Sequence, residues 1–291
     1  MKKDYSIIIP HKNCPELLQR CINSIPKDNN IQIIVVDDNS DIDKRPNIIE
    51  PNCEVFFLRE DESRGAGKAR NVGLTHAVGE WVIFADSDDF FSSQFYNILR
   101  EYKHDESDII FFNVESVMSY DITIKATRTK DYLFERGKIQ GSDVFRYAYC
   151  EPWGKMIKRN LISNNRIWFD ETKVSNDYYF SVKSGCMASK IKIIDLPLYV
   201  VTLRENSLSY NFADTKEKIL TRIDVAIRVQ KILKEYGYKE KPMPIRGLMV
   251  LLLKKHPLLF FKKLVSLIPE RINILSLLYQ MFNPKYFRSH H

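Results

Sequence analysis

Four short apolar runs near the N-terminus constrain the fold more than any other feature. They occupy residues 5–10, 31–36, 55–58 and 81–85. Their length and their content of β-branched and aromatic residues are typical of strands buried on both faces of a parallel sheet. Apolar residues at helical spacing follow the first run, and residues 67–78 also predict a helix. This alternation predicts a Rossmann-like α/β fold with a mostly parallel sheet, in which ligands bind beyond the carboxyl ends of the strands.

Carboxylates gather where two of these runs end. Asp37 and Asp38 follow the second run, and the sequence Asp-Ser-Asp-Asp at residues 86–89 follows the fourth. Side chains alternate along an extended backbone, so Asp86 and Asp88 are expected on the same side. Converging carboxylates repel unless a cation lies between them, and oxygen ligands suit Mg²⁺ or Mn²⁺. Asp-Ser-Asp-Asp is also good turn and helix-cap material, so the motif alone leaves a metal–diphosphate site and a plain turn open.

A basic segment that contains glycines follows the third run. Gly65 and Gly67 permit close approach of the backbone to a ligand, while Arg64, Lys68 and Arg70 offer positive charge to an anion. The segment is not a Walker phosphate-binding loop, because alanine stands where serine or threonine should hold magnesium. A solvated loop that begins a helix is the alternative.

Four motifs in this order and spacing resemble the family 2 glycosyltransferases, which are inverting enzymes of the GT-A fold that build bacterial surface polysaccharides. The motifs are Ser-Ile-Ile-Ile-Pro at 6–10, Val-Val-Asp-Asp-Asn-Ser at 35–40, Gly-x-Gly-x-Ala-Arg-Asn-x-Gly at 65–73, and Gly-Glu-x-x-x-Phe-x-Asp-Ser-Asp-Asp at 79–89. The resemblance is close over about the first hundred residues and continues more loosely to about residue 210.

The resemblance implies that a nucleotide sugar, most simply a UDP-linked one, is the donor substrate. Pro10 and His11 would border the base, and Asp38 would form a hydrogen bond with it. Arg64 or Lys68 would face the base or the diphosphate.

The resemblance also implies a divalent cation, Mn²⁺ or Mg²⁺, as the cofactor. Asp86 would reach the ribose and the metal, Ser87 would belong to the donor site, and Asp88 would be the direct metal ligand. A Lewis acid is needed because the leaving nucleoside diphosphate develops negative charge.

A later segment resembles the acceptor half of the family, in which a Trp-x-Lys sequence precedes an acidic pair that opens a helix. The second acid of that pair is the general base of inverting members, and it corresponds to Asp177, whereas Asn176 replaces the first acid. A helix cap is the alternative for these residues. Trp153, Lys155 and Arg204 are implied contacts of the acceptor or diphosphate, although a large aromatic is more often buried and the cations could be surface charges.

Charge and cysteine usage exclude some classes of protein. Residues 214–291 contain sixteen Lys or Arg against six Asp or Glu, while the whole chain carries a net charge of +7, so residues 1–213 are slightly acidic. A uniformly basic nucleic-acid binder would not show this distribution. The five cysteines form no Cys-x-x-Cys pair, and no secretory leader precedes the first strand. These features predict free thiols and a cytoplasmic protein.

The basic C-terminal region is predicted to be helical. Residues 215–236 form an amphipathic pattern, and residues 245–268 alternate apolar blocks with two pairs of lysines. This composition suits a helix in an anionic membrane interface, which would make the protein peripheral on the inner face of the cell membrane. A helical hairpin packed on the main domain or on a second subunit of a homodimer fits almost as well.

The predicted organisation has three regions. Residues 1–112 form the nucleotide-sugar half and residues 113–213 the acceptor half of one GT-A domain, while residues 214–291 form a C-terminal α-helical extension. Residues 115–138 are expected to be an irregular polar excursion.

The predicted activity is transfer of a sugar from a nucleotide sugar to a hydroxyl of a glycan or a lipid-linked oligosaccharide. A sugar nucleotidyltransferase is one alternative, which predicts pyrophosphate release and a glycine-rich loop after the first strand. A sugar-nucleotide-binding module that has lost catalysis is another, because Asn176 departs from the family pattern.

Overall fold

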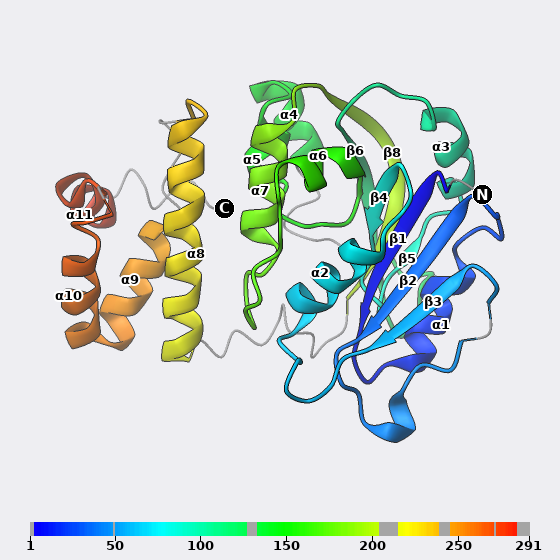
Figure 1. The fold of residues 1–291 in the computed structure, drawn as a ribbon. Coiled ribbons are helices and arrows are strands. Elements are labelled where there is room, and N and C mark those ends of the chain that lie inside the picture. The colour runs from blue at the N-terminus through cyan, green and yellow to red at the C-terminus, as the bar shows by residue number, and fades with distance from the viewer. Residues whose placement is uncertain are drawn as a thin grey trace. The chain divides into compact units, whose positions relative to one another are not determined.

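The four N-terminal apolar runs form neighbouring parallel strands in the computed structural model (Figure 1). Their order in the sheet is β3-β2-β1-β4, so the first strand of the chain lies in the middle of this group. The strands are β1 (Tyr5–His11), β2 (Ile31–Asp37), β3 (Cys53–Phe57) and β4 (Trp81–Phe84). The sheet predicted from the apolar runs is therefore confirmed.

Four further strands extend the sheet beyond β4 in the order β7-β6-β8-β5. β7 is antiparallel to both of its neighbours, β6 and β8 are parallel, and β5 is antiparallel to β8. These strands are β5 (Phe90–Phe91), β6 (Ile109–Met118), β7 (Lys155–Lys158) and β8 (Ile191–Leu203). The predicted boundary between residues 112 and 113 falls inside β6, so both halves of the predicted domain share one sheet.

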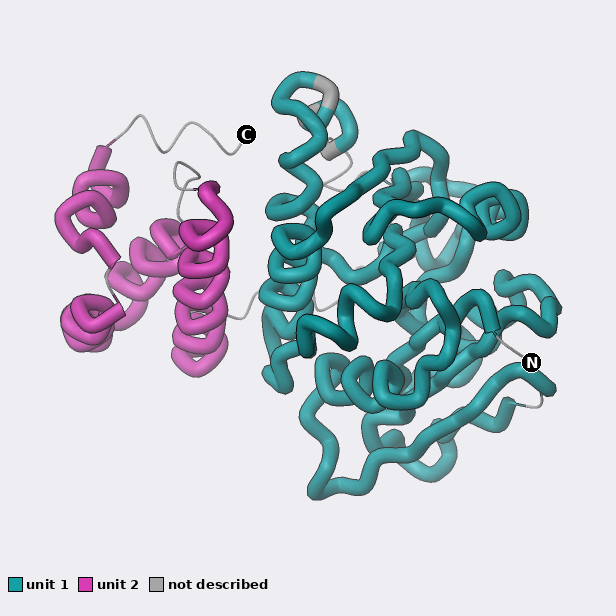
Figure 2. Tube along the Cα trace, turned by 45° about the horizontal axis from the view of Figure 1, so that its top comes forward, with its two compact units in different colours: residues 1–211 teal, residues 212–291 magenta. Residues whose placement is uncertain are grey.

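The structure describes residues 3–48, 50–126, 133–203, 215–238, 245–270 and 272–283. The chain divides into two units, which we call unit 1 (residues 1–211) and unit 2 (residues 212–291), shown in teal and magenta in Figure 2. The described helices of unit 1 are α1 (Pro15–Asn23), α2 (Ala66–His76), α3 (Phe95–Tyr102), α4 (Leu133–Gln140), α5 (Val144–Ala148), α6 (Arg159–Asn164) and α7 (Tyr178–Met187), with a short 3₁₀ turn at Ile42–Lys44.

Helix α2 packs unusually close to the sheet, where it contacts β1 and β2 (Figure 1). A Cβ atom on Gly73 would lie 2.4 Å from Cγ2 of Ile8, so this helix position needs glycine. After the helix, the backbone N–H of Gly79 donates a hydrogen bond of 2.8 Å to the hydroxyl of Ser6 in β1. These contacts set the position of α2 against β1.

Unit 2 is helical in its described residues. Its helices are α8 (Lys216–Glu235), α9 (Ile245–Lys255), α10 (Pro257–Ser266) and α11 (Ile274–Phe282). α9 contacts each of the other three. The fully buried side chains of this unit's core include Ile223, Met249 and Leu252. Helix α9 ends before His256, and Pro257 begins a new helix. Residues 245–268 therefore form two helices, which pack in a helical core.

One sequence expectation was wrong: residues 115–138 are not irregular throughout. β6 continues to Met118 because β8 is long enough to pair with it as far as Leu203. Strand pairing satisfies backbone groups whatever the side chains are, so polar residues on this stretch did not prevent it. Leu133–Gln140 then forms α4.

Candidate active site

The carboxyl ends of β2, β1 and β4 lie side by side, because β1 pairs with β2 on one side and with β4 on the other. The register sets His11 opposite Asp37, and it sets Ile8 opposite Phe84, the residue that ends β4. The acidic clusters that follow β2 and β4 therefore share one edge of the sheet, as expected from the strand order.

Asp37 is a buried anchor rather than an exposed ligand. Its carboxylate accepts hydrogen bonds from the backbone N–H of Ser40 (2.8 Å) and the Ser40 hydroxyl (2.5 Å), and it lies 2.8 Å from Nδ1 of His11. Burial opposes protonation of His11, but its contacts with Cys14 and Asp37 outweigh burial and raise the pKa of the imidazole. The contact between His11 and Asp37 holds the β1 and β2 ends together.

Asp38 has one satisfied and one unsatisfied oxygen. Its Oδ2 accepts a hydrogen bond of 3.2 Å from the backbone N–H of Gly65 and lies 3.5 Å from Nζ of Lys12. Its Oδ1 is buried and has no hydrogen-bond partner among the described residues. A buried acceptor without a partner costs free energy, so this atom points to a donor that a ligand would bring.

Residues 86–89 form a turn, which corrects the expectation of an extended backbone. The N–H of Asp89 donates to the carbonyl of Asp86 at 3.1 Å. Arg20 and Thr202 both donate to the carbonyl of Asp88, and the N–H of Asp86 donates to the hydroxyl oxygen of Tyr199 at 2.7 Å. The backbone is thus held from α1 and β8, while the side chains of Asp86 and Asp88 remain partly exposed.

The carboxyl groups of the turn affect one another and the nearby Cys21. Burial raises the pKa of the Asp89 carboxyl well above its ordinary range, and the charges of Asp88 and Asp86 raise it further. Burial likewise raises the pKa of the Cys21 thiol, with the same three carboxylates adding to the effect. A cation at the turn would relieve this repulsion.

A metal ion would need ligands from the substrate as well as from the protein. No three His, Cys, Asp or Glu side chains are grouped to hold a metal ion within the described ranges. Asp86 and Asp88 can supply carboxylates from the same turn, and diphosphate oxygens can complete such a site. The donor set therefore fits a divalent cation that binds together with a diphosphate.

Arg70 connects the two halves of unit 1. Its guanidinium donates to Oδ1 of Asp86 at 2.5 Å and to Oδ1 of Asn176 at 2.9 Å. The side chain is buried, and it lies over the ring of Phe169. The sequence indicated Arg70 only as a positive charge for an anion. Its place in the Ala-Arg-Asn motif was the signal available, but its two partners were not visible there.

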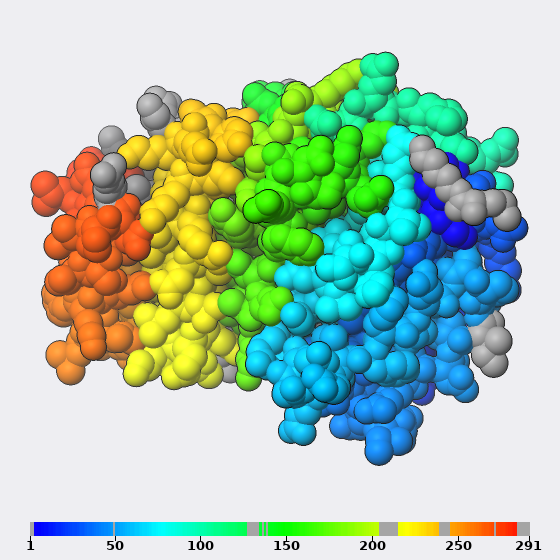
Figure 3. Space-filling view, viewed as in Figure 1, coloured from blue at the N-terminus to red at the C-terminus, as the bar shows by residue number. Residues whose placement is uncertain are grey.

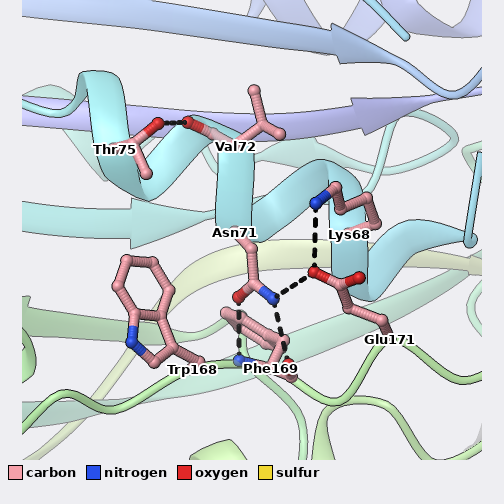
Figure 4. Close-up of a pocket in the computed structure, with 7 residues that line it drawn as sticks. All are labelled: Lys68, Asn71, Val72, Thr75, Trp168, Phe169 and Glu171. Carbon is pink, nitrogen blue, oxygen red and sulfur yellow. Dashed lines mark hydrogen bonds and ion pairs between the residues drawn. The ribbon is translucent and has the colours of Figure 1, made fainter. Parts of the chain in front are cut away.

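Helix α2 holds the segment that leads to Asn176 (Figure 4). The side-chain amide of Asn71 accepts from the N–H of Phe169 (2.9 Å) and donates to its carbonyl (3.0 Å). Lys68 pairs with Glu171 at 3.4 Å. A Cβ on Gly67 would lie 2.0 Å from the carbonyl oxygen of Asp170, so glycine permits this approach. The structure thus shows contacts within the protein for Gly67, Lys68 and Asn71.

Asp177 stands at the start of α7 and is partly exposed. No hydrogen bond from its side chain caps the helix. Two residues earlier, Ser175 has a φ of 55°, which is the left-handed region that non-glycine residues rarely adopt. Such strain costs about 1–3 kcal/mol and clusters at functional sites. The packing of residues 167–176 against α2 therefore determines the position of Asp177 at the start of α7.

The predicted acceptor contacts lie mainly in the interior. Trp153 is only 6 % exposed and stacks on Tyr199, and the ammonium of buried Lys155 donates to the carbonyl of Tyr149 at 2.7 Å. Trp168, by contrast, is 46 % exposed and lines the pocket in Figure 4 with Lys68 and other residues of α2. Arg204 lies outside the described residues.

The remaining predicted donor residues surround the strand ends. Pro10 is buried within β1, Arg64 is exposed, and the hydroxyl of Ser87 lies 3.2 Å from Sγ of Cys14. Burial alone would raise the pKa of the Cys14 thiol, but His11 and Ser87 lower it instead. The sequence did not single out Cys14, because nothing local indicated that it would meet Ser87.

Comparison with known proteins gives one family. The model described as "Glycosyl transferase family 2" matches residues 6–189. The chain is 28% identical over 224 residues to the glycosyltransferase GlyA of Streptococcus pneumoniae serotype 4, covering 70% of this chain and 31% of that protein. It is 28% identical over 216 residues to the poly(ribitol-phosphate) beta-N-acetylglucosaminyltransferase TarS of Staphylococcus aureus, covering 69% and 36%. The chain spans about a third of the length of these two curated relatives.

Among solved structures, the crystal structure of S. aureus TarS 1–349 in complex with UDP-GlcNAc is similar, with a TM-score of 0.61 and 21% sequence identity. The similarity covers 97% of this chain and 82% of that one. At this identity the likeness shows a shared fold.

Proposed function

This chain belongs to glycosyl transferase family 2, and we propose that it transfers a sugar from a UDP-sugar to a hydroxyl of a glycan or lipid-linked acceptor during synthesis of a surface polysaccharide. The family and the α/β fold class, GT-A with helices at the C-terminus, are confirmed by the family match and the likeness to TarS. The donor, the acceptor, the metal and the inverting mechanism are proposals.

The unpartnered buried Oδ1 of Asp38 carries the proposal. It lies at the carboxyl ends of β2, β1 and β4, where the chain also presents Asp86 and Asp88. The N3–H of uracil is a hydrogen-bond donor that can satisfy a carboxylate oxygen, whereas N3 of cytosine is an acceptor. A uridine nucleotide therefore suits this edge, with its diphosphate toward the turn at residues 86–89.

The names of related proteins support a UDP-sugar donor and inversion. TarS was crystallised with UDP-GlcNAc, and it is named as a poly(ribitol-phosphate) beta-N-acetylglucosaminyltransferase. A Bacillus spizizenii relative, 28% identical over 240 residues, is named as a poly(ribitol-phosphate) beta-glucosyltransferase. A β product from an α-linked UDP-sugar requires inversion at the anomeric carbon.

Asp177 is proposed as the general base. It would take the proton of the acceptor hydroxyl as that oxygen bonds to the anomeric carbon, while the bond from this carbon to the diphosphate oxygen breaks on the opposite face. Arg70 supports the assignment, because it links Asp86 to Asn176, the neighbour of Asp177. Asn176 accepts from Arg70 as a carboxylate would, so its replacement of the usual acid preserves this contact.

Asp88, with Asp86 beside it, is proposed to hold Mg²⁺ or Mn²⁺ jointly with the donor. Such an ion, when bound, would stabilise the negative charge of the departing diphosphate. Arg64 and Lys68 stay predictions as donor contacts, and Lys68 would have to exchange its contact with Glu171.

Nucleotide binding tests the donor assignment without requiring an acceptor. Isothermal titration of the full chain with UDP and CDP in the presence of Mn²⁺ should show tighter binding of UDP. Asp38→Leu should abolish that preference, and Asp88→Ala should remove the effect of Mn²⁺. Equal affinities for UDP and CDP would overturn the role of Asp38.

Transfer assays test the base assignment. UDP release from UDP-GlcNAc and UDP-glucose would be measured with poly(ribitol phosphate) and with lipid-linked oligosaccharides as acceptors. Asp177→Asn should keep UDP affinity and lower transfer by about 100-fold or more. Asp43→Asn, at an exposed position in the 3₁₀ turn, is the matched control. Normal transfer by the Asp177 variant would contradict the mechanism.

A further inference from the structure

Helices α10 and α11 each carry a line of apolar side chains on the outside of unit 2. The residues follow helical spacing, three or four positions apart, and each is at least 59 % exposed. We call them the apolar stripe: Leu258, Phe261, Val265 and Ile268 along and just after α10, and Leu275, Tyr279 and Phe282 along α11. In Figure 3 these helices, orange to red, form part of the visible surface of the unit.

Packing on the opposite side fixes the stripe in its exposed position. Phe260 and Leu267 of the α10 region, and Leu277 and Met281 of α11, lie in the buried core of unit 2. Rotating either helix to hide its stripe would expose these core residues. The stripe is therefore built into the unit. Large exposed apolar side chains at successive turns of a helix are unusual for a soluble surface and mark a site of interaction.

Lysines lie close in sequence to the α10 part of the stripe. Residues 245–269 contain five Lys or Arg and no Asp or Glu. Lys254, Lys255 and Lys262 are exposed, while Lys263 pairs with Asp224 of α8. An apolar line bordered by lysines matches a surface whose outer layer is anionic and whose inner layer is hydrocarbon.

A second copy of the chain fits this surface less well. A symmetric contact through the stripe would bring the lysines of both copies together, and like charges repel. Anionic lipid headgroups instead attract them. No helix in the described part of the chain is long and apolar enough to cross a bilayer, so contact would be limited to the interface.

We propose that the apolar stripe of α10 and α11 docks unit 2 on an anionic lipid surface. The apolar side chains enter the boundary between headgroups and acyl chains, and the exposed lysines contact the headgroups. This interaction requires neither donor binding nor transfer, so it stands apart from the function proposed for unit 1.

Vesicle binding of the full chain tests the proposal. Co-sedimentation would use vesicles of equal parts phosphatidylglycerol and phosphatidylcholine, with pure phosphatidylcholine for comparison, in low-salt buffer. Wild type should bind the anionic vesicles, and added salt should weaken binding. The double variant Leu258→Glu/Leu275→Glu should bind about tenfold or more weakly.

The matched control places the same change at equal exposure in unit 1. Ile42 and Ile139 are each 85% exposed, close to the 87% of Leu258. Ile42→Glu/Ile139→Glu should bind vesicles like wild type. Circular dichroism should show both variants folded, because all four positions are at the surface. Replacing Lys254, Lys255 and Lys262 with Gln should remove the preference for phosphatidylglycerol.

Three results would overturn the proposal. Wild type could fail to sediment with anionic vesicles, or the stripe and control variants could bind equally. Light scattering during size-exclusion chromatography could also show a wild-type dimer that the stripe variant converts to a monomer while vesicle binding is unchanged. That last result would assign the stripe to a second copy.

Discussion

The two units of this protein differ in which side chains they bury and which they expose. Unit 1 buries charged groups at its sheet edge, including His11, Asp37, Asp38 and Arg70. In unit 2, Gln230 is the sole buried polar side chain among the described residues, and the apolar stripe is exposed. Burying charge costs free energy unless partners are in place, and exposing apolar area forfeits stabilisation.

This difference indicates where each unit meets another molecule. Unit 1 holds polar atoms through hydrogen bonds, and the buried Oδ1 of Asp38 has no hydrogen-bond partner among the described residues. This arrangement suits chemistry on a polar ligand. Unit 2 has a simple aliphatic core and leaves apolar side chains outside, which suits contact with an apolar phase.

The largest effect is expected from the core of unit 2. Leu252→Ala removes a fully buried side chain and should cost about 3 kcal/mol of unfolding free energy. Hydrogen exchange should show lost protection in α8–α11 and unchanged protection in β1–β4. Leu253→Ala, on the same helix but half-buried, should cost less. Lost protection in the sheet would show that the units do not fold independently.

Alanine substitutions at two helix glycines should change the free energy of unfolding in opposite directions. Gly67→Ala forces a Cβ against the backbone of Asp170 and should cost about 2 kcal/mol, because backbone cannot rotate away. It should also lower transfer, since the segment leading to Asp177 must shift. Gly247→Ala in α9 meets no atom within 4 Å and should stabilise unit 2 by about 0.5–1 kcal/mol. Urea denaturation measures both, and a neutral Gly67→Ala would contradict the tight packing.

Arg70→Lys tests whether the planar guanidinium of Arg70 contributes more to stability than its positive charge alone. Lysine cannot bond Asp86 and Asn176 in the same planar geometry, so stability should fall by about 1.5–2 kcal/mol. UDP affinity should change less than the transfer rate. Arg59→Lys, at an exposed arginine near Asp61 and Glu62, should change stability by less than about 0.5 kcal/mol. Similar effects of the two changes would remove the special role of Arg70.

The smallest effect concerns pH. The raised pKa of His11 means that its contribution to stability is complete below about pH 6.5 and is lost as pH rises through the folded value. The lowered pKa of Cys14 acts oppositely, because its contribution is lost as pH falls. A Cys14→Ser background removes the opposing titration of Cys14 and one of the contacts that raise the pKa of His11, but Asp37 still faces the imidazole. The free energy of unfolding of unit 1 in that background should therefore fall with rising pH. His11→Gln in that background should flatten this dependence, and an unchanged slope would exclude His11 as the source.

Local pattern was enough to predict four strands of the eight-stranded sheet and the acids at their carboxyl ends. The strands β1 to β4 were identified from runs of β-branched and aromatic residues, which determine burial over a few residues. The turn at residues 86–89 was not, because the same four residues suit an extended or a turned backbone. The partners that decide between them come from α1 and β8.

The sequence also did not predict which of two tryptophans, Trp153 or Trp168, is buried. The sequence left Trp153 open as an acceptor contact or a buried aromatic. In the structure Trp153 is buried and stacks on Tyr199, while Trp168 remains exposed beside α2. Nothing within a few residues of either indole distinguishes the two. Which one faces solvent depends on strands that arrive from elsewhere in the chain.

By itself, the sequence determined the family, the four N-terminal strands and the acids that follow two of them, because these depend on short-range periodicity and ordered motifs. The tertiary structure alone decided that Arg70 joins Asp86 to Asn176, although Arg70 and Asn176 are 106 positions apart. It also decided that one side of α10 and α11 stays exposed. Both depend on which surfaces pack together, and packing is a property of the folded chain as a whole.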